Sequence, residues 1–175
     1  NYKRGWAAIG HSTAFKDNGE WFFASHYRGT YMDRHRFFLG VWKMHFINDW
    51  PVLEPNRYTG EGSIDLEKAD ISGNYRIQIL HQSAVNSALT DDVISIVKRA
   101  EAITLTTEKD GDWYLVSGEY GGRYRINEGL LELELDGTLY SGRITPQFNY
   151  EFEEGVLGLS LINDEGTALW GNRIG

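Results

Sequence analysis

The stretch Phe15-Lys16-Asp17-Asn18-Gly19-Glu20-Trp21-Phe22-Phe23 places an Asn-Gly pair between two aromatic segments. Asn-Gly favours a tight β-hairpin, because both central residues of a type I′ turn need a positive φ. A second turn signal, Asn48-Asp49, precedes the short run Trp50-Pro51-Val52-Leu53. These signals predict four short strands, over residues 6–15, 20–27, 37–46 and 50–53.

Four strands joined by turns are the layout of one blade of a β-propeller. A single blade cannot bury its own faces, because repeat architectures need several neighbours to enclose a core. Apolar side chains such as Phe37, Phe38, Val41 and Phe46 would stay uncovered on a lone blade. We therefore expect residues 1–58 to be the terminal blade of a larger protein, whose earlier blades form a separate chain or fragment.

A string of short strands is expected from residue 71 onward. Tight-turn signals such as Gly121-Gly122, Asp136-Gly137 and Asp164-Glu165-Gly166 separate them, which predicts an up-and-down barrel or a sandwich. The expected strands cover residues 73–80, 103–108, 112–118, 122–127, 129–135, 138–145, 147–152, 156–162 and 166–171. Side chains large enough to fill a small barrel are Leu131, Leu133, Leu135, Leu157, Leu159 and Leu161. Residues 90–98 combine an N-cap signal with β-branched residues, so a short helix and a strand both remain open there.

Charge and composition exclude some classes of partner. The net charge is −8 at neutral pH, which argues against nucleic acid, because that binding depends on cationic contacts to phosphate. Residues 1–60 hold eight Lys/Arg and five Asp/Glu, whereas residues 61–175 hold nine and twenty, so two units with different surfaces are expected. The chain has no cysteine, and no apolar run approaches the ~18 residues of a membrane span. We therefore expect neither disulfides nor a membrane partner.

Two blocks of motifs carry a resemblance to a known family. The first block holds Gly10-His11-Ser12, the turn from Asp17 to Trp21, His26-Tyr27-Arg28, Trp50-Pro51-Val52 and Pro55-Asn56-Arg57-Tyr58. The second block holds Ile71-Ser72-Gly73-Asn74-Tyr75, the segment from Asp136 to Gly142 and the segment from Asn163 to Gly171. In this order they resemble glycoside hydrolase family 43, in particular its arabinan endo-1,5-α-L-arabinosidases (arabinanases). Asp49 stands where that family usually has glycine.

The resemblance implies an all-β chain: the last blade of a five-bladed β-propeller followed by a small lipocalin-like β-barrel. The expected boundaries are residues 1–58 for the blade, 59–70 for a linker and 71–175 for the barrel. The short linker, with Arg57 and Tyr58 as anchors, predicts a barrel that is docked against the propeller. The implied function is inverting hydrolysis of α-1,5-linked arabinan, in an extracellular or periplasmic protein.

The resemblance places the catalytic carboxylates in earlier blades, so no catalytic acid or base is expected in this chain. It implies that His11 points into the propeller channel and helps to hold one hydrated calcium ion. Without the resemblance, a buried histidine bonded to the backbone would be the simpler interpretation of His11. His26 and Arg28 are candidates for substrate binding at the cleft rim, or for pairing with nearby carboxylates.

Other polar and aromatic residues have simpler interpretations. Asp17 and Asp49 are expected to form turns, and Asp33 has no assigned role. Trp170 is expected to plug one end of the barrel, with sugar stacking as the alternative. Histidines without a motif, expected to be solvated or packed, are His35, His45 and His81.

Three functions compete at this level. The first is the C-terminal part of an arabinan-degrading hydrolase, the second a non-catalytic carbohydrate-binding module, and the third a ligand-carrying barrel. A binding module or a carrier would not bring an unpaired blade with it, and a carrier needs a cavity that the inward leucines would fill. The sequence therefore favours the hydrolase.

Overall fold

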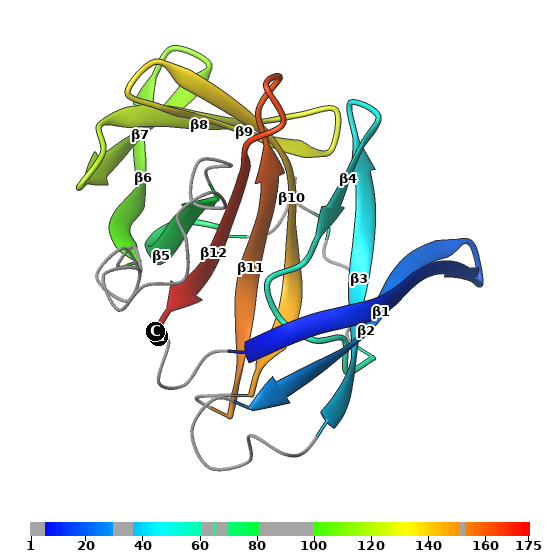
Figure 1. The fold of residues 1–175 in the computed structure, drawn as a ribbon. Helices are drawn as coiled ribbons and strands as arrows, with labels where there is room; N and C mark the ends of the chain where they lie inside the picture. Colours follow the sequence, from blue (N-terminus) through cyan, green and yellow to red (C-terminus); the bar gives the residue numbers. More distant parts are fainter. Residues whose placement is uncertain (1–5, 30–36, 61–64, 66–69, 81–99, 151–152) are drawn as a thin grey trace.

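The computed structural model describes residues 6–29, 37–60, 65, 70–80, 100–150 and 153–175 (Figure 1). The first part is a four-stranded antiparallel sheet in the order β1-β2-β3-β4. Its strands are β1 (Trp6–Asp17), β2 (Glu20–Gly29), β3 (Phe37–Ile47) and β4 (Trp50–Leu53). The four predicted strands are confirmed, whereas the propeller to which they would belong stays a prediction.

The second part is a closed antiparallel barrel in which β10 meets β9 on one side and β11 on the other. The all-β prediction is confirmed, since no helix occurs among the described residues. The described residues therefore also contain no helix that is long and apolar enough to cross a membrane. The barrel strands are β5 (Gly73–Leu80), β6 (Glu101–Asp110), β7 (Trp113–Gly118), β8 (Gly122–Asn127), β9 (Leu130–Leu135), β10 (Thr138–Asn149), β11 (Glu154–Ile162) and β12 (Ala168–Ile174).

The hairpin turns have the backbone conformation that their residues favour. Asn18 and Gly19 have φ values of 48° and 87°, and Asn48 and Asp49 have 48° and 66°. Positive φ at both central positions is the geometry of a type I′ turn. Asp49 therefore adopts a left-handed backbone conformation. Glycine has the lowest conformational energy there, and Asn and Asp are the side-chain-bearing residues most often found in it.

Apolar side chains fill the barrel interior, as the alternating pattern predicted. Leu131, Leu133, Leu159 and Leu161 have no exposed surface, Leu135 is 3% exposed, and the partly buried Leu157 packs against the same cluster. Buried tyrosines find hydrogen-bond acceptors there: Tyr75 donates to the Ile71 carbonyl at 2.8 Å and Tyr124 to the Thr106 carbonyl at 2.6 Å. A core filled in this way does not favour a ligand-carrying barrel.

One strand boundary was predicted wrongly. The expected strands 138–145 and 147–152 are a single strand, β10, which runs through Pro146 to Asn149. β9 pairs with β10 only as far as Gly142, whereas β11 pairs with it over Ser141–Asn149. Pro146 thus lies where β10 has a neighbour on one side only, and there a missing N–H does not interrupt a ladder. The predicted helix or strand at 90–98 lies outside the described residues.

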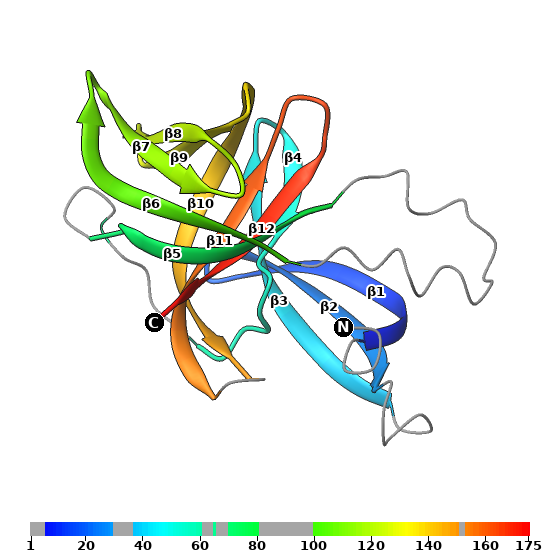
Figure 2. The same cartoon turned by 90° about the vertical axis from the view of Figure 1, so that its left-hand side faces the viewer.

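The sheet packs against the outside of the barrel through β4 and β11. Ile47 and Val52 of the sheet form one apolar cluster with Ile162 and Leu130 of the barrel. The barrel thus docks on the four-stranded sheet, whereas docking on a whole propeller stays a prediction. Figure 2 shows the sheet lying alongside the barrel strands.

Trp170 belongs to this junction and does not plug the barrel. Leu169 and Gly171 are buried, and Trp170 between them is only partly buried. Because successive side chains of a strand point to opposite faces, Trp170 lies on the outer face. Its indole Nε1 donates a hydrogen bond to the Leu53 carbonyl of β4 at 2.7 Å.

The two predicted anchors also make contacts at this junction. Arg57 Nη1 donates to the Tyr27 hydroxyl at 2.6 Å, and its guanidinium carbon lies 4.2 Å from the ring centroid of Tyr150. The rings of Tyr58 and Phe22 lie 5.0 Å apart. Arg57 therefore contacts both the sheet and the barrel, and Tyr58 contacts the sheet.

Candidate functional site

An irregular segment of β1 presents His11 to solvent. The register of β1 against β2 shifts between Ala7 and Gly10 and again between Gly10 and Thr13. His11 lies in this bulge with a φ of 47°, which is uncommon for a residue with a side chain, and it is exposed. Bulges redirect side chains and occur next to functional sites. The strand geometry thus singles out the residue that the motif had selected.

Ser25 holds the bulge in place from the neighbouring strand. Its buried hydroxyl lies within 3.0 Å of the Gly10 carbonyl and 3.1 Å of the His26 carbonyl, and it shares its proton between them. The Ser12 hydroxyl donates to Ser25 Oγ at 3.1 Å. The small polar residues around His11 therefore fix its backbone, a role that the sequence reasoning did not assign to Ser12 or Ser25.

The structure brings His26 next to His11. Their ring centroids lie 5.0 Å apart, and the His26 ring meets the edge of Phe37 at the same distance. Arg28 belongs to β2, where it pairs with Phe37 in register, and its side chain lies outside the described part of the structure. Of the three predicted site residues, the structure thus places two side chains together.

The described residues around His11 do not form a metal site by themselves. Among the described residues no group of three or more His, Cys, Asp or Glu side chains gathers in a metal-binding arrangement. His11 presents an exposed imidazole, and calcium prefers oxygen ligands. The described part of the chain would therefore supply at most a minor share of the coordination, with water and other parts of the protein supplying the rest.

The other candidates have structural roles or lie outside the described part. Asp17 closes the β1–β2 hairpin opposite Glu20, and Asp49 forms the β3–β4 turn, so both are turn formers as predicted. His45 Nε2 lies 2.9 Å from Glu54 Oε1, which makes His45 a packed histidine. The described ranges do not include Asp33, His35 or His81.

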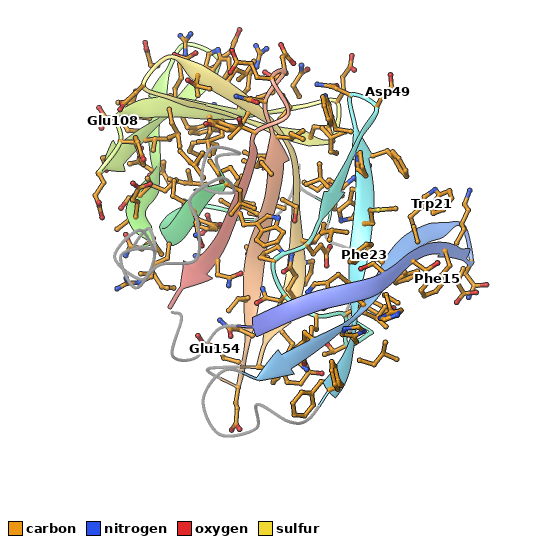
Figure 3. All side chains as sticks on the ribbon, in the orientation of Figure 1. Phe15, Trp21, Phe23, Asp49, Glu108 and Glu154 are labelled. Atoms are coloured by element: carbon orange, nitrogen blue, oxygen red, sulfur yellow. The ribbon has the colours of Figure 1, made fainter. Side chains whose placement is uncertain are left out.

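Aromatic side chains are exposed along the four-stranded sheet. Phe15 and Trp21 project from the β1–β2 hairpin (Figure 3), and Trp21 meets Phe46 edge-on at 5.7 Å. The strand register places Trp21 and Phe46 on one face of the sheet and Phe37 and Trp50 on the other. Both faces therefore expose large apolar side chains, which are candidates for contact with another protein surface. The exposed fractions are Phe15 40%, Trp21 36%, Phe37 54%, Phe38 38%, Leu39 73%, Phe46 52% and Trp50 43%.

Comparison with known proteins identifies relatives over almost the whole chain. An extracellular endo-α-(1→5)-L-arabinanase 2 from Bacillus subtilis is 27% identical over 179 residues, which cover 97% of this chain and 34% of the relative. The solved endo-1,5-α-L-arabinanase of Thermotoga petrophila, in complex with TRIS, matches with a TM-score of 0.74 at 25% identity. The match covers 98% of this chain and 37% of the arabinanase chain. The chain thus spans about a third of the length of these relatives.

A second solved relative has the same fold. It is the YxiA protein of Bacillus licheniformis, described as a glycoside hydrolase of family 43, with a TM-score of 0.73 at 24% identity; the match covers 98% of this chain and 36% of the relative. Residues 55–171 match the GH43_C family, described as a C-terminal lipocalin-like domain. The barrel and the residues that follow β4 are therefore those of a known domain family: the chain is homologous to part of the arabinanases and belongs to the GH43_C family of C-terminal lipocalin-like domains.

Proposed function

We propose that this chain is the C-terminal part of a glycoside hydrolase that cleaves α-1,5-linked arabinan by an inverting mechanism. The likeness to an endo-arabinanase over 97% of the chain, but only 34% of that relative, carries the proposal. The catalytic acid and base would belong to a part of the protein outside this sequence. Like the Bacillus subtilis relative, which is described as extracellular, the protein would act outside the cytoplasm.

The exposed aromatic surface of the sheet supports a partner in this proposal. Side chains such as Phe37, Phe46 and Trp50 are 43–54% exposed, and apolar surface of this extent is normally covered by another protein surface. The earlier propeller blades, as a separate chain or fragment, would cover it. His11 would face the channel that they complete and would contribute one ligand to a calcium ion, and His26 and Arg28 would lie at the rim where arabinan binds.

A non-catalytic carbohydrate-binding or ligand-carrying module is the alternative function. The filled barrel interior speaks against a carrier. An independent binding module would use the exposed aromatic rings of the sheet against sugar rings and would need no companion chain. The two functions differ in whether an active enzyme contains this chain.

The test measures hydrolysis of debranched arabinan by this chain alone and by the protein together with its proposed catalytic part. We expect no hydrolysis by the chain alone, because cleavage needs two carboxyl groups across the scissile bond. We expect hydrolysis by the combined protein, with the β-anomer as the first product in proton NMR, since inversion reverses the α configuration. Activity of the isolated chain, or an α-anomeric first product, would contradict the proposal.

The companion itself is tested by native mass spectrometry and N-terminal sequencing of the purified protein. We expect a second chain that carries the earlier blades, because the aromatic surface needs cover. A chain that is monomeric, compact and cooperatively folded by itself would remove this argument.

A further inference from the structure

A groove of about 730 Å³ runs along the outside of the barrel, and its lining residues do not include His11 or its neighbours in β1. Outward side chains of the paired strands β5 and β12 form its floor, among them Arg76, Gln78 and Asn172. Residues 55–57, which follow β4, and residues 148–150, at the end of β10, form its walls. Small-molecule sites have volumes of ~300–1,000 Å³, so the groove has room for a short oligosaccharide.

Hydrogen bonds hold the polar side chains of this groove in place. Asn56 Nδ2 donates to Gln147 Oε1 and to Asn172 Oδ1, each at 2.8 Å. Gln147 is itself packed over Gly158, where a Cβ atom would lie only 2.3 Å from the Gln147 amide. Side chains fixed in this way lose little entropy when a ligand binds.

Arginine side chains give the groove positive charge, although residues 61–175 carry a net negative charge. Arg57, Arg76 and Arg173 line it, with Glu154 as the carboxylate among the lining residues. Arg173 Nη1 donates to the Asp70 carbonyl at 3.2 Å. Arg76 is exposed and makes no hydrogen bond or ion pair within the described part of the chain. Its guanidinium is thus available to a carboxylate, which it can bind through two parallel hydrogen bonds.

Aromatic rings also line the groove. Phe148, Tyr150 and Trp170 line the same groove, and the rings of Phe148 and Tyr150 meet edge-on at 5.1 Å. Tyr150 is 47% exposed although Arg57 covers one side of its ring. Aromatic faces pack against the C–H surfaces of sugar rings, amides bond to hydroxyl groups, and guanidinium groups bind carboxylates. A neutral sugar would use the first two features and leave the exposed Arg76 without an anionic partner.

We propose that this groove binds an acidic oligosaccharide, whose uronic acid carboxylate pairs with the exposed Arg76 and whose sugar ring packs on Tyr150. The site would attach the protein to an acidic polysaccharide without taking part in bond cleavage. It goes beyond the proposed hydrolase function and does not depend on it. A phosphate ion alone would leave most of the groove and its aromatic walls without contacts.

The test is calorimetric titration of the purified protein, with its companion where one is present, with tetragalacturonate. We expect saturable binding that weakens as salt rises, because the ion pairs are exposed to solvent. The fully methyl-esterified tetramer has the same length but no charge, and it should bind at least about ten-fold more weakly. Equal binding of the ester or of a neutral arabino-oligosaccharide would overturn the proposal, as would no detectable binding of tetragalacturonate at millimolar concentration.

The matched variants are Arg76→Gln and Arg143→Gln. Arg143 is an exposed arginine of β10 that lies outside the groove and also has no ion pair within the described ranges. We expect Arg76→Gln to weaken tetragalacturonate binding at least about ten-fold, and Arg143→Gln to leave it unchanged. Both variants should keep the melting temperature, since both side chains are exposed. Equal effects of the two variants on tetragalacturonate binding would overturn the proposal. So would an Arg76→Gln variant that keeps its affinity for the sugar, whether or not it also loses the companion chain.

Discussion

Replacing Glu54 by alanine is expected to lower the free energy of unfolding by about 3 kcal/mol. Glu54 follows β4 and is only 3% exposed. Its Oε1 lies 2.9 Å from His45 Nε2 in the sheet and accepts a hydrogen bond from Thr145 Oγ1 of the barrel at 2.8 Å. Alanine would leave both donors without their acceptor at a buried junction. Urea unfolding measures the loss, and the sheet and the barrel should then unfold less cooperatively.

Two control variants separate the hydrogen bonds of Glu54 from its charge. Glu54→Gln keeps an oxygen that can accept from both donors, so its cost should stay within about 1 kcal/mol. Glu108→Ala removes an exposed carboxylate on β6 (Figure 3) and should change stability by less than about 0.5 kcal/mol. If Glu54→Ala were as stable as Glu108→Ala, Glu54 would not hold the two parts together.

Local features of the fold could be predicted from the sequence. The Asn18-Gly19 and Asp136-Gly137 turns follow from residues that tolerate positive φ, and both pairs have it. The alternation around Leu131 and Leu133 follows from the two-residue period of a strand, and both side chains are buried. These features depend only on residues that are adjacent in the sequence, so a sequence pattern is enough to predict them.

Features that depend on distant partners could not be predicted in the same way. The length of β10 depends on where β9 stops, and the position of Trp170 depends on the Leu53 carbonyl, 117 residues away. Glu54 and Thr145 lie 91 residues apart, and no local pattern pairs them. At the candidate site, the motif selected His11 and His26, whereas the buried contact of Ser25 that holds the bulge needs the register of β1 against β2.

Replacing His11 by asparagine is expected to lower bound calcium and hydrolysis at least about ten-fold in the active assembly. The motif selects His11, the bulge exposes it, and its φ of 47° fixes the direction of the side chain. Asparagine tolerates this left-handed conformation better than most residues, so the variant removes the imidazole without adding backbone strain. Calcium content by atomic emission, arabinan hydrolysis and the melting temperature are measured on the same sample.

The melting temperature separates a lost ligand from a lost fold. The sheet is held by buried side chains such as Phe22, Trp42 and Ile47, whereas the His11 imidazole is exposed and makes its ring contact with His26. His11→Asn should therefore melt within about 2 °C of the parent protein, as should Thr13→Ala on the same strand, which should also keep its calcium. Unchanged calcium and unchanged hydrolysis in His11→Asn would make His11 an ordinary surface histidine. A large drop in melting temperature would instead show that the imidazole supports the bulge, because the hydrogen bonds of Ser25 to Gly10 and Ser12 remain available in the variant.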